Sequence, residues 1–235
     1  MRIRSGFFAL AAAAVIALVP SSARAQTWTT WTFGSAGLFT GSLFGSTVTY
    51  TGGNIGGQLS DGTDVAGTLT YNGGSDFFNP GNPYNQNGMN VPGLGMIQFN
   101  GATRLNTITF ANAVVNPFIA LISVGQSNMP ITYAFSDPFI VRSDNNCPTP
   151  SYWSCGSYST VGNSLIGNEF SGTIEFSGTF TSLTFSTDPD EDWHGFTVGA
   201  HGAATAVTPE PATMTLVATG LVGMMGVARR RKRSA

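Results

Sequence analysis

The sequence has 235 residues with ten basic and twelve acidic side chains, and its net charge is −2. The charges are unevenly distributed, because residues 26–208 hold eleven of the acids and two basic residues, Arg104 and Arg142. This stretch therefore carries a net charge of about −9 and cannot neutralise a phosphate backbone, which excludes nucleic acid as a partner.

Residues 1–25 have the three parts of a secretory signal peptide. Two arginines precede an apolar run from Phe7 to Val19, and a small-x-small cleavage site ends at Ala25. About a dozen apolar residues suit a signal peptide and are short for a membrane span, although an uncleaved anchor or a buried helix is the alternative. We therefore expect export through the inner membrane and a mature chain that begins at Gln26.

Residues 26–202 show short runs in which apolar and polar residues alternate. This period of two is typical of strands with one buried face. The stretch Pro117–Val124 is instead almost continuously apolar, as in a central strand covered on both faces. The residues spaced two apart are Val48 and Tyr50, Leu69 and Tyr71, Ile108 and Phe110, Ile131, Tyr133 and Phe135, Ile174 and Phe176, and Phe196 and Val198.

Turn-forming pairs such as Asp61-Gly62 and Asn100-Gly101 separate these runs. About ten to twelve short strands without an amphipathic helix predict an all-β domain, an antiparallel β-sandwich of jelly-roll type. The pattern alone does not distinguish a β-sandwich from a β-barrel. Small residues at 203–208 predict a linker after the domain.

Two loops carry aromatic side chains that are candidates for sugar binding. The loop 79–92 is rich in Asn and Pro, contains Tyr84, and is expected on the surface. The second loop, residues 144–158, contains Tyr152 and Trp153. The alternative is that Trp153 packs beside the neighbouring cysteines and that the Asn-rich loop only makes turns.

The two cysteines, Cys147 and Cys155, both lie in the exported part. In an oxidising compartment such a close pair usually forms a disulfide. The bond would close a loop of about nine residues and stabilise the fold by about 2.5 kcal/mol through chain entropy. A redox or metal role is less consistent with this spacing, because it is not C-x-x-C and no histidine is near.

The acidic turn near residue 190 is the one candidate metal site. Carboxylates at Asp188, Asp190 and Asp192 could gather oxygen ligands around Ca²⁺. The sixth position, where an EF-hand loop has glycine, is Trp193. The alternative is a solvated hairpin loop whose acids face water. No other cofactor is expected.

Few residues suit an enzyme. His194 and His201 are the two histidines, and the motifs G-x-S-x-G and H-E-x-x-H and a phosphate loop are absent. His194 alternates with Phe196 and Val198, which favours a place on a strand face over a catalytic triad. A pair of glycosidase carboxylates leaves no local spacing pattern, so a hydrolase stays an alternative to the non-catalytic protein that we expect.

A second apolar segment, Ala212–Ala228, contains no charge. Its seventeen residues would give a helix of roughly 25 Å, the short end of what spans a bilayer. Basic residues directly after a span stay in the cytoplasm, whereas a buried core helix would not explain them. These basic residues are Arg229, Arg230, Arg231, Lys232 and Arg233.

The tripeptide Pro209, Glu210 and Pro211 stands directly before this apolar segment. The order of tripeptide, apolar segment and basic cluster over 209–233 closely resembles the PEP-CTERM sorting signal of Gram-negative bacteria that make extracellular polysaccharide. The resemblance implies that a membrane-embedded exosortase recognises the tripeptide, that a C-terminal helix holds the protein in the inner membrane, and that the tail is cleaved. Two prolines keep such a site extended. A plain anchor with an incidental tripeptide is the alternative.

The segment 182–199 is similar, more loosely, to the last hairpin of the β-rich domains that accompany this signal. We therefore expect a protein of the cell surface, outer envelope or extracellular matrix. The leading interpretation is a non-catalytic structural or interaction component of the exopolysaccharide or biofilm layer. A lectin-like module that binds extracellular polysaccharide is the second, and a polysaccharide hydrolase is the third.

Overall fold

The structure is a computed structural model, and it describes residues 26–35, 38–59, 78, 83–92, 95–99, 103–146, 155–204 and 219–221. The strands among these residues pair antiparallel throughout, which confirms the predicted all-β, antiparallel class. The elements are β1 (Thr27–Trp28), β2 (Thr30–Ser35), β3 (Leu38–Leu43), β4 (Ser46–Thr51), β5 (Asn54–Leu59), the 3-10 helix η1 (Gln86–Gly88), β6 (Gly95–Phe99), β7 (Thr103–Val124), β8 (Ile131–Phe135), β9 (Ile140–Asp144), β10 (Ser157–Val161), β11 (Ser164–Asn168), β12 (Phe170–Glu175), β13 (Thr179–Asp188) and β14 (His194–Ala203).

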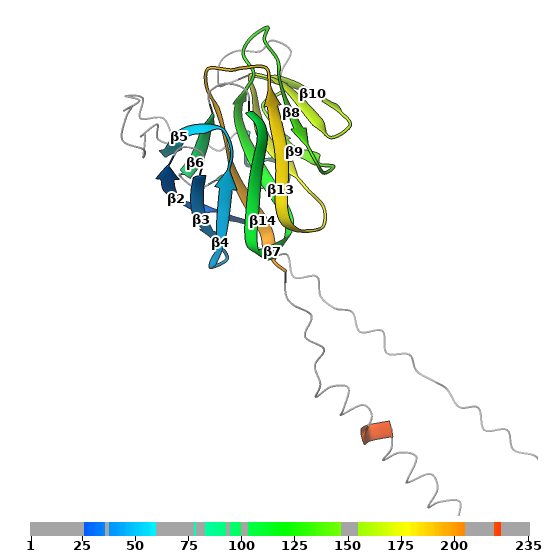
Figure 1. The fold of residues 1–235 in the computed structure, drawn as a ribbon. Coiled ribbons are helices and arrows are strands. Elements are labelled where there is room, and N and C mark those ends of the chain that lie inside the picture. The colour runs from blue at the N-terminus through cyan, green and yellow to red at the C-terminus, as the bar shows by residue number, and fades with distance from the viewer. Residues whose placement is uncertain are drawn as a thin grey trace, which may run out of the picture.

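The long strand β7 belongs to both halves of the sheet (Figure 1). Its first part, residues 103–110, pairs with β4 and β13. Its last part, residues 114–124, pairs with β12 and β14. Because one strand runs through both halves, the strands form a single connected sheet, whereas a simple sandwich has two separate ones.

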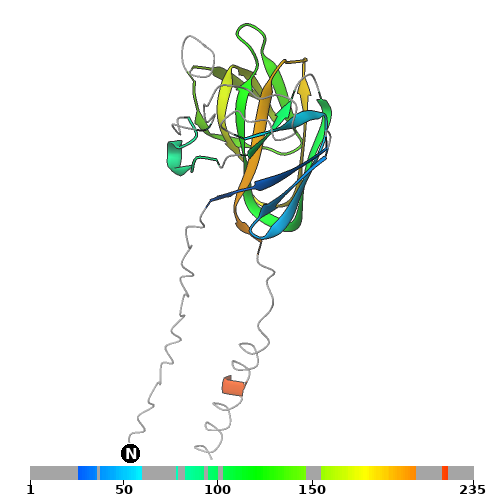
Figure 2. The same cartoon turned by 90° about the vertical axis from the view of Figure 1, so that its left-hand side faces the viewer.

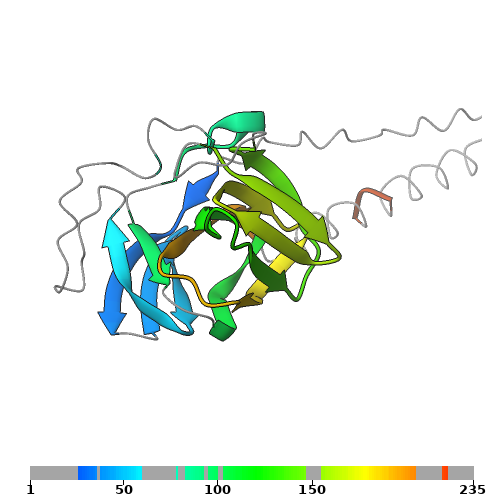
Figure 3. The same ribbon diagram turned by 90° about the horizontal axis from the view of Figure 1, so that it is seen from above.

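The sheet folds over so that two layers share one interior (Figures 2 and 3). The first layer has the order β2–β3–β4–β7–β13–β8–β11–β10, and the second has the order β5–β6–β14–β7–β12–β9, with β1 also beside β14. Aromatic rings join the layers: Tyr50 on β4 lies 5.4 Å from Phe196 on β14, and Phe135 on β8 lies 5.3 Å from Phe176 after β12, measured between ring centroids. Since these strands are not hydrogen-bonded neighbours, the contacts place the two layers face to face.

The inner faces follow the predicted period of two. On β4, Val48 and Tyr50 are buried while the threonines between and beside them are more exposed. β-branched and aromatic residues suit such a half-buried surface, and each fully buried large side chain stabilises by about 1.5–3 kcal/mol. The other predicted residues that lie in this core are Ile108, Phe110, Ile131, Tyr133, Phe135, Ile174, Phe176, Phe196 and Val198. Leu69 and Tyr71 lie outside the described residues.

The last part of β7 is buried on both faces, as its continuous apolar run predicts. Ile119 and Leu121 point into the main core, whereas Ala120 and Ile122 point to the outer face of the second layer. On that face they meet a second apolar cluster. It consists of Phe78, Tyr84, Met96, Ala120 and Ile122, with Trp28 and Trp193 packed against it.

Segment 83–92 is the described part of the loop that was expected on the surface, and it supplies the cover for this outer face. Tyr84 is 1% exposed, and its hydroxyl donates a hydrogen bond of 3.0 Å to the carbonyl of Leu121. Met89 is also buried. The structure thus contradicts a surface position for Tyr84 and removes it from the candidate sugar-binding residues, because the outward apolar side chains of β7 require an apolar cover.

Most of the predicted targeting segments lie outside the described residues, including residues 1–25 and 205–218. Of the apolar segment 212–228, only residues 219–221 are described, and they are helical. Within the described part of the chain, none of the helices has the length and apolar character needed to cross a membrane. The C-terminal membrane helix therefore stays a prediction.

Candidate functional site

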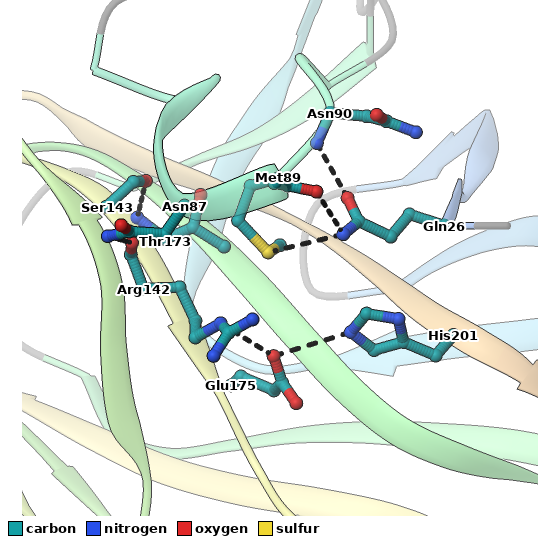
Figure 4. A network of polar contacts seen from close by, with 10 residues as sticks. Gln26, Asn87, Met89, Asn90, Arg142, Ser143, Thr173, Glu175 and His201 are labelled. Atoms are coloured by element: carbon teal, nitrogen blue, oxygen red, sulfur yellow. Dashed lines mark hydrogen bonds and ion pairs between the residues drawn. The ribbon is translucent and has the colours of Figure 1, made fainter. Parts of the chain in front are cut away.

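A polar cluster of Arg142, Glu175 and His201, called the outer cluster below, lies on the outer face of the second layer (Figure 4). Its members come from β9, β12 and β14. The strand register sets Glu175 opposite Phe118 on β7, and Phe118 opposite Gly199 on β14. The outer cluster therefore joins strands that are brought together by pairing through β7.

Period two decides which side chains reach this face. Ile174 and Phe176 lie in the main core, so Glu175 between them points outward. Val198 and Ala200 also lie in the core, and His201 follows them on the opposite face. The alternation thus places Glu175 and His201 on the face of the sheet opposite the core residues of the same strands.

One carboxylate oxygen holds the outer cluster together. Oε2 of Glu175 lies 3.1 Å from Nε of Arg142 and 3.4 Å from Nε2 of His201. The side chains of Arg142, Glu175 and His201 are 34%, 9% and 21% exposed, respectively. A nearly buried carboxylate needs such partners, because a buried and unpaired charge is costly. The outer cluster is therefore fixed at its carboxylate and open to solvent at its two ends.

Aromatic rings lie beside the outer cluster. The ring of Phe118 lies 5.2 Å from the imidazole of His201 and 4.6 Å from the ring of Trp28, both in edge-to-face geometry. Gly199 makes room for this packing, since a Cβ there would come within 2.4 Å of Cε2 of Phe118. Trp28 is half-buried, so its ring borders both the apolar cover and the solvent.

Segment 83–92 is tied to the strands on both sides of the outer cluster. Towards β9, the side-chain amide of Asn87 donates a hydrogen bond of 2.7 Å to the carbonyl of Arg142. Towards β1, the side chain of Gln26 accepts a hydrogen bond of 2.6 Å from the backbone of Asn90 and donates one of 2.8 Å to the carbonyl of Gly88. Hydrogen bonds to residues far away in the chain thus hold segment 83–92 beside the outer cluster.

A second polar cluster, called the buried cluster below, consists of Tyr133, Glu191 and His194. The hydroxyl of Tyr133 lies 2.8 Å from Nδ1 of His194. Oε2 of Glu191 accepts a hydrogen bond of 3.0 Å from the backbone N–H of Gly125 and lies 3.4 Å from the same His194 nitrogen. The buried cluster therefore ties the start of β14 to β8 and to the end of β7.

Burial changes the acidity of this second group. Burial chiefly, with the nearby Glu169 and Asp192 adding to it, raises the pKa of Glu191 to about 8, although the hydrogen bond from Gly125 acts in the opposite direction. Burial also raises the pKa of Tyr133 well above its usual value, and the charge of Glu191 adds to this effect. The raised pKa favours the protonated form of Glu191, which lies with Tyr133 and His194 in one polar network.

The acidic turn lies between β13 and β14. Asp188, Asp190 and Asp192 are exposed there, while Glu191 points inward. In the described ranges, no group of three or more His, Cys, Asp or Glu side chains is arranged to hold a metal ion. The Ca²⁺ site at these aspartates stays a prediction without geometric support, and a calcium titration that leaves the melting temperature unchanged would remove it.

Several other predicted residues cannot be placed, since they lie outside the described residues. They are Tyr152, Trp153, Cys147, the tripeptide Pro209, Glu210 and Pro211, and the basic residues 229–233. Cys155 is described, and among the described residues no cysteine is free. The pairing of Cys147 with Cys155 stays a prediction.

The two histidines belong to different clusters. His194 is buried on the same face of β14 as Phe196, in agreement with the predicted strand position, while His201 lies on the outer face. The outer cluster as a whole was missed from the sequence. Its one local signal is Glu175, a charged residue between two core residues, Ile174 and Phe176.

Comparison with known proteins gives one match. The family model described as the PEP-CTERM protein-sorting motif matches residues 207–232. No curated protein and no solved structure matches the chain. The match confirms the sorting signal predicted from the C-terminal tripeptide, apolar segment and basic cluster, and it leaves the role of the β domain to be argued from its own geometry.

Proposed function

We propose that this PEP-CTERM protein, which exosortase sorts, is a non-catalytic structural or interaction component of the exopolysaccharide or biofilm layer. The observation that carries the proposal is the sorting motif at residues 207–232, which follows an all-β domain almost directly. Proteins with this motif are exported and are associated with the cell surface through exosortase. An acidic, β-rich body suits a place in a hydrated matrix, because its net charge keeps it soluble.

The carboxyl groups of the two polar clusters do not form the pair that hydrolysis of a sugar chain generally needs. Hydrolysis of a glycosidic bond generally uses two carboxyl groups on either side of the bond. The outer cluster has one, and Arg142 and His201 share it. The buried carboxyl groups of Glu169 and Glu191 are both enclosed by the protein. Within these two clusters, the arrangement favours a binding or structural role over hydrolysis.

The positions of the two ends support presentation at a surface. β1 pairs with β14, with Thr27 opposite Ala200, so the described N-terminal and C-terminal ends of the domain leave at the same end (Figure 2). An anchor that follows Ala204 would hold the domain by this end, and the opposite end would project away from the membrane. We include in the proposal a jelly-roll-like sandwich, a C-terminal membrane helix with a cytoplasmic basic tail, and a Cys147–Cys155 disulfide.

Intact-mass analysis of the protein recovered from the cell surface tests the sorting step. We expect a mature species that begins at Gln26 and has lost everything beyond the Pro-Glu-Pro region. A strain without exosortase should retain the full tail and serves as the control. If the surface protein of the normal strain still contains Arg229–Arg233, a permanent membrane anchor replaces the proposed sorting.

A carbohydrate-binding module is the second candidate, and the outer cluster is the observation that favours it. Tyr84 is no longer a candidate sugar-binding residue, because it is buried. Tyr152 and Trp153 stay predicted sugar-binding residues. A polysaccharide hydrolase is the third candidate, and turnover of the host polysaccharide by the purified protein would promote it above the other two.

A further inference from the structure

We propose that the outer cluster, with Trp28 beside it, is a binding site for a neutral polysaccharide, which it would hold through neighbouring hydroxyl groups of one sugar ring. The inference rests on the proposed place of the protein in the polysaccharide layer, and it assigns the ligand class and the residues. Arg142, Glu175 and His201 would make the polar contacts.

The hydrogen-bonding groups of the outer cluster are only partly used. The contacts within it involve Nε of Arg142, Nε2 of His201 and one oxygen of Glu175. Among contacts between described residues, they leave the terminal amino groups of Arg142 as donors, the second oxygen of Glu175 as an acceptor, and Nδ1 of His201. A sugar hydroxyl both donates and accepts a hydrogen bond, so two adjacent hydroxyls match a donor and an acceptor that lie side by side.

The site is fixed in advance and can be reached. Glu175 is held between Arg142 and His201 and is nearly buried, so little side-chain freedom remains to be lost when a ligand binds. The side chains of Arg142 and His201 keep 34% and 21% of their surface exposed. In Figure 4 the three side chains converge on one carboxylate oxygen.

The surroundings combine an apolar surface with amides. Trp28 is half-buried and lies against Phe118, which in turn contacts His201. Binding sites for small polar ligands commonly have this composition, with aromatic side chains and a few convergent polar groups. Asn87 and Asn90 are exposed on segment 83–92, which is joined to the outer cluster by the hydrogen bond from Asn87 to the carbonyl of Arg142. They could contact further sugar units along a chain.

Charge selects the ligand class. The exported part carries about −9, and the arginine of the outer cluster is already paired with Glu175. An acidic polysaccharide would meet repulsion from the domain as a whole. A cationic ligand would have to compete with Arg142 for the same carboxylate. A neutral polysaccharide is not repelled by the acidic domain and does not compete with Arg142 for the carboxylate of Glu175.

The experiment uses the full chain, purified in detergent, and measures its retardation in gels that contain a neutral polysaccharide. The probes are dextran, laminarin and galactomannan, with polygalacturonate as the acidic comparison. We expect retardation by at least one neutral probe and none by polygalacturonate. Retardation by no neutral probe, or stronger retardation by the acidic one, overturns the proposal.

Matched variants locate the site. Arg142→Gln and Glu175→Gln each remove one charge and keep hydrogen-bonding atoms, and we expect at least about a tenfold weaker affinity for the retained probe. Arg104→Gln removes the same charge from the first part of β7, in the other layer, and should leave the affinity unchanged. Equal affinity in Arg142→Gln and Arg104→Gln overturns the assignment. Thermal unfolding of each variant separates lost binding from lost folding, and a variant that unfolds is replaced by His201→Gln.

The intact mass of the protein recovered separately from the surface of the host cells distinguishes failure of this inference from failure of the proposed function. A protein that has lost its tail, lies at the cell surface and binds none of the neutral probes contradicts the sugar site alone. A protein that keeps its tail contradicts the sorting proposal, whatever it binds.

Discussion

The outer cluster and the buried cluster both place a glutamate beside a histidine of β14, yet they differ in their surroundings. Glu175 pairs with the guanidinium group of Arg142, and the side chains of Arg142 and His201 are partly exposed to solvent. Glu191 is enclosed with Tyr133, and its nearby charged groups include the acids Glu169 and Asp192. The comparison shows that the partner and the access of solvent, rather than the residue types, set the two clusters apart.

The largest effect that the comparison predicts is a loss of stability in alkali through Glu191. The folded pKa of about 8 lies above the usual 4.5, so the folded protein favours the protonated carboxyl. This stabilisation is complete below pH 4.5, falls as the pH rises, and is lost above about 8. Since one pKa unit corresponds to about 1.4 kcal/mol, the free energy of unfolding should drop by an amount on the order of 4 kcal/mol. Denaturant titrations at pH 5 and pH 9 measure the drop.

Glu191→Gln is the control for this prediction. The amide keeps an acceptor for the N–H of Gly125 and cannot ionise, so the variant should lose most of the difference between pH 5 and pH 9. Glu175→Gln should keep it. If both variants keep the full difference, the alkaline loss has another origin and the contrast between the two clusters weakens.

Breaking the ion pair of the outer cluster should have a smaller effect. Glu175→Ala leaves Arg142 without its partner, and we expect the free energy of unfolding to fall by about 1–2 kcal/mol. This value lies between those for surface pairs and for fully buried pairs, because Arg142 keeps a third of its side chain exposed. Thermal or urea unfolding at pH 7 measures it. A loss above about 4 kcal/mol would show that the outer cluster behaves as a buried one.

The smallest expected effect concerns the wall beside the outer cluster. Tyr84→Phe removes the hydroxyl that donates to the carbonyl of Leu121 and keeps the buried ring, which should cost about 1 kcal/mol. The urea midpoint should fall with an unchanged slope. Tyr84→Ala serves as the comparison, since loss of the ring itself should cost about 3–5 kcal/mol. An unaffected Tyr84→Ala variant would contradict the assigned role of segment 83–92 as a cover.

Local pattern was enough to predict much of the fold. Val48 and Tyr50 show their inward face by alternation alone, and the run Pro117–Val124 indicates a strand buried on both sides. A strand that is buried on both sides needs an apolar cover over its outer face. Segment 83–92 lies on the surface as predicted, with exposed asparagines, but its side chains Tyr84 and Met89 are buried, and Tyr84 belongs to the cover.

The outer cluster could not be predicted, because its residues meet only through strand register. His201 and Glu175 are 26 residues apart, and β7 separates their strands in the sheet. The passage of β7 through both layers is equally non-local. A bulge in the pairing of β12 with β9 also shifts the register on the way from Arg142 to Glu175. No spacing within a single strand carries this information.

The central place of β14 in its layer has a consequence for how the protein reaches its final form. β14 pairs with β7 on one side and with β1 and β6 on the other, so the first strand of the domain needs the last one as a partner. For a chain exported from its N-terminus, the second layer can close only after residue 203 has crossed the membrane. The sorting motif begins a few residues later, at 207, so completion of the sheet and arrival of the processing signal follow one another closely. Assembly that depends on such distant partners is slow, and the predicted membrane helix of the tail would hold the chain in place while the sheet forms.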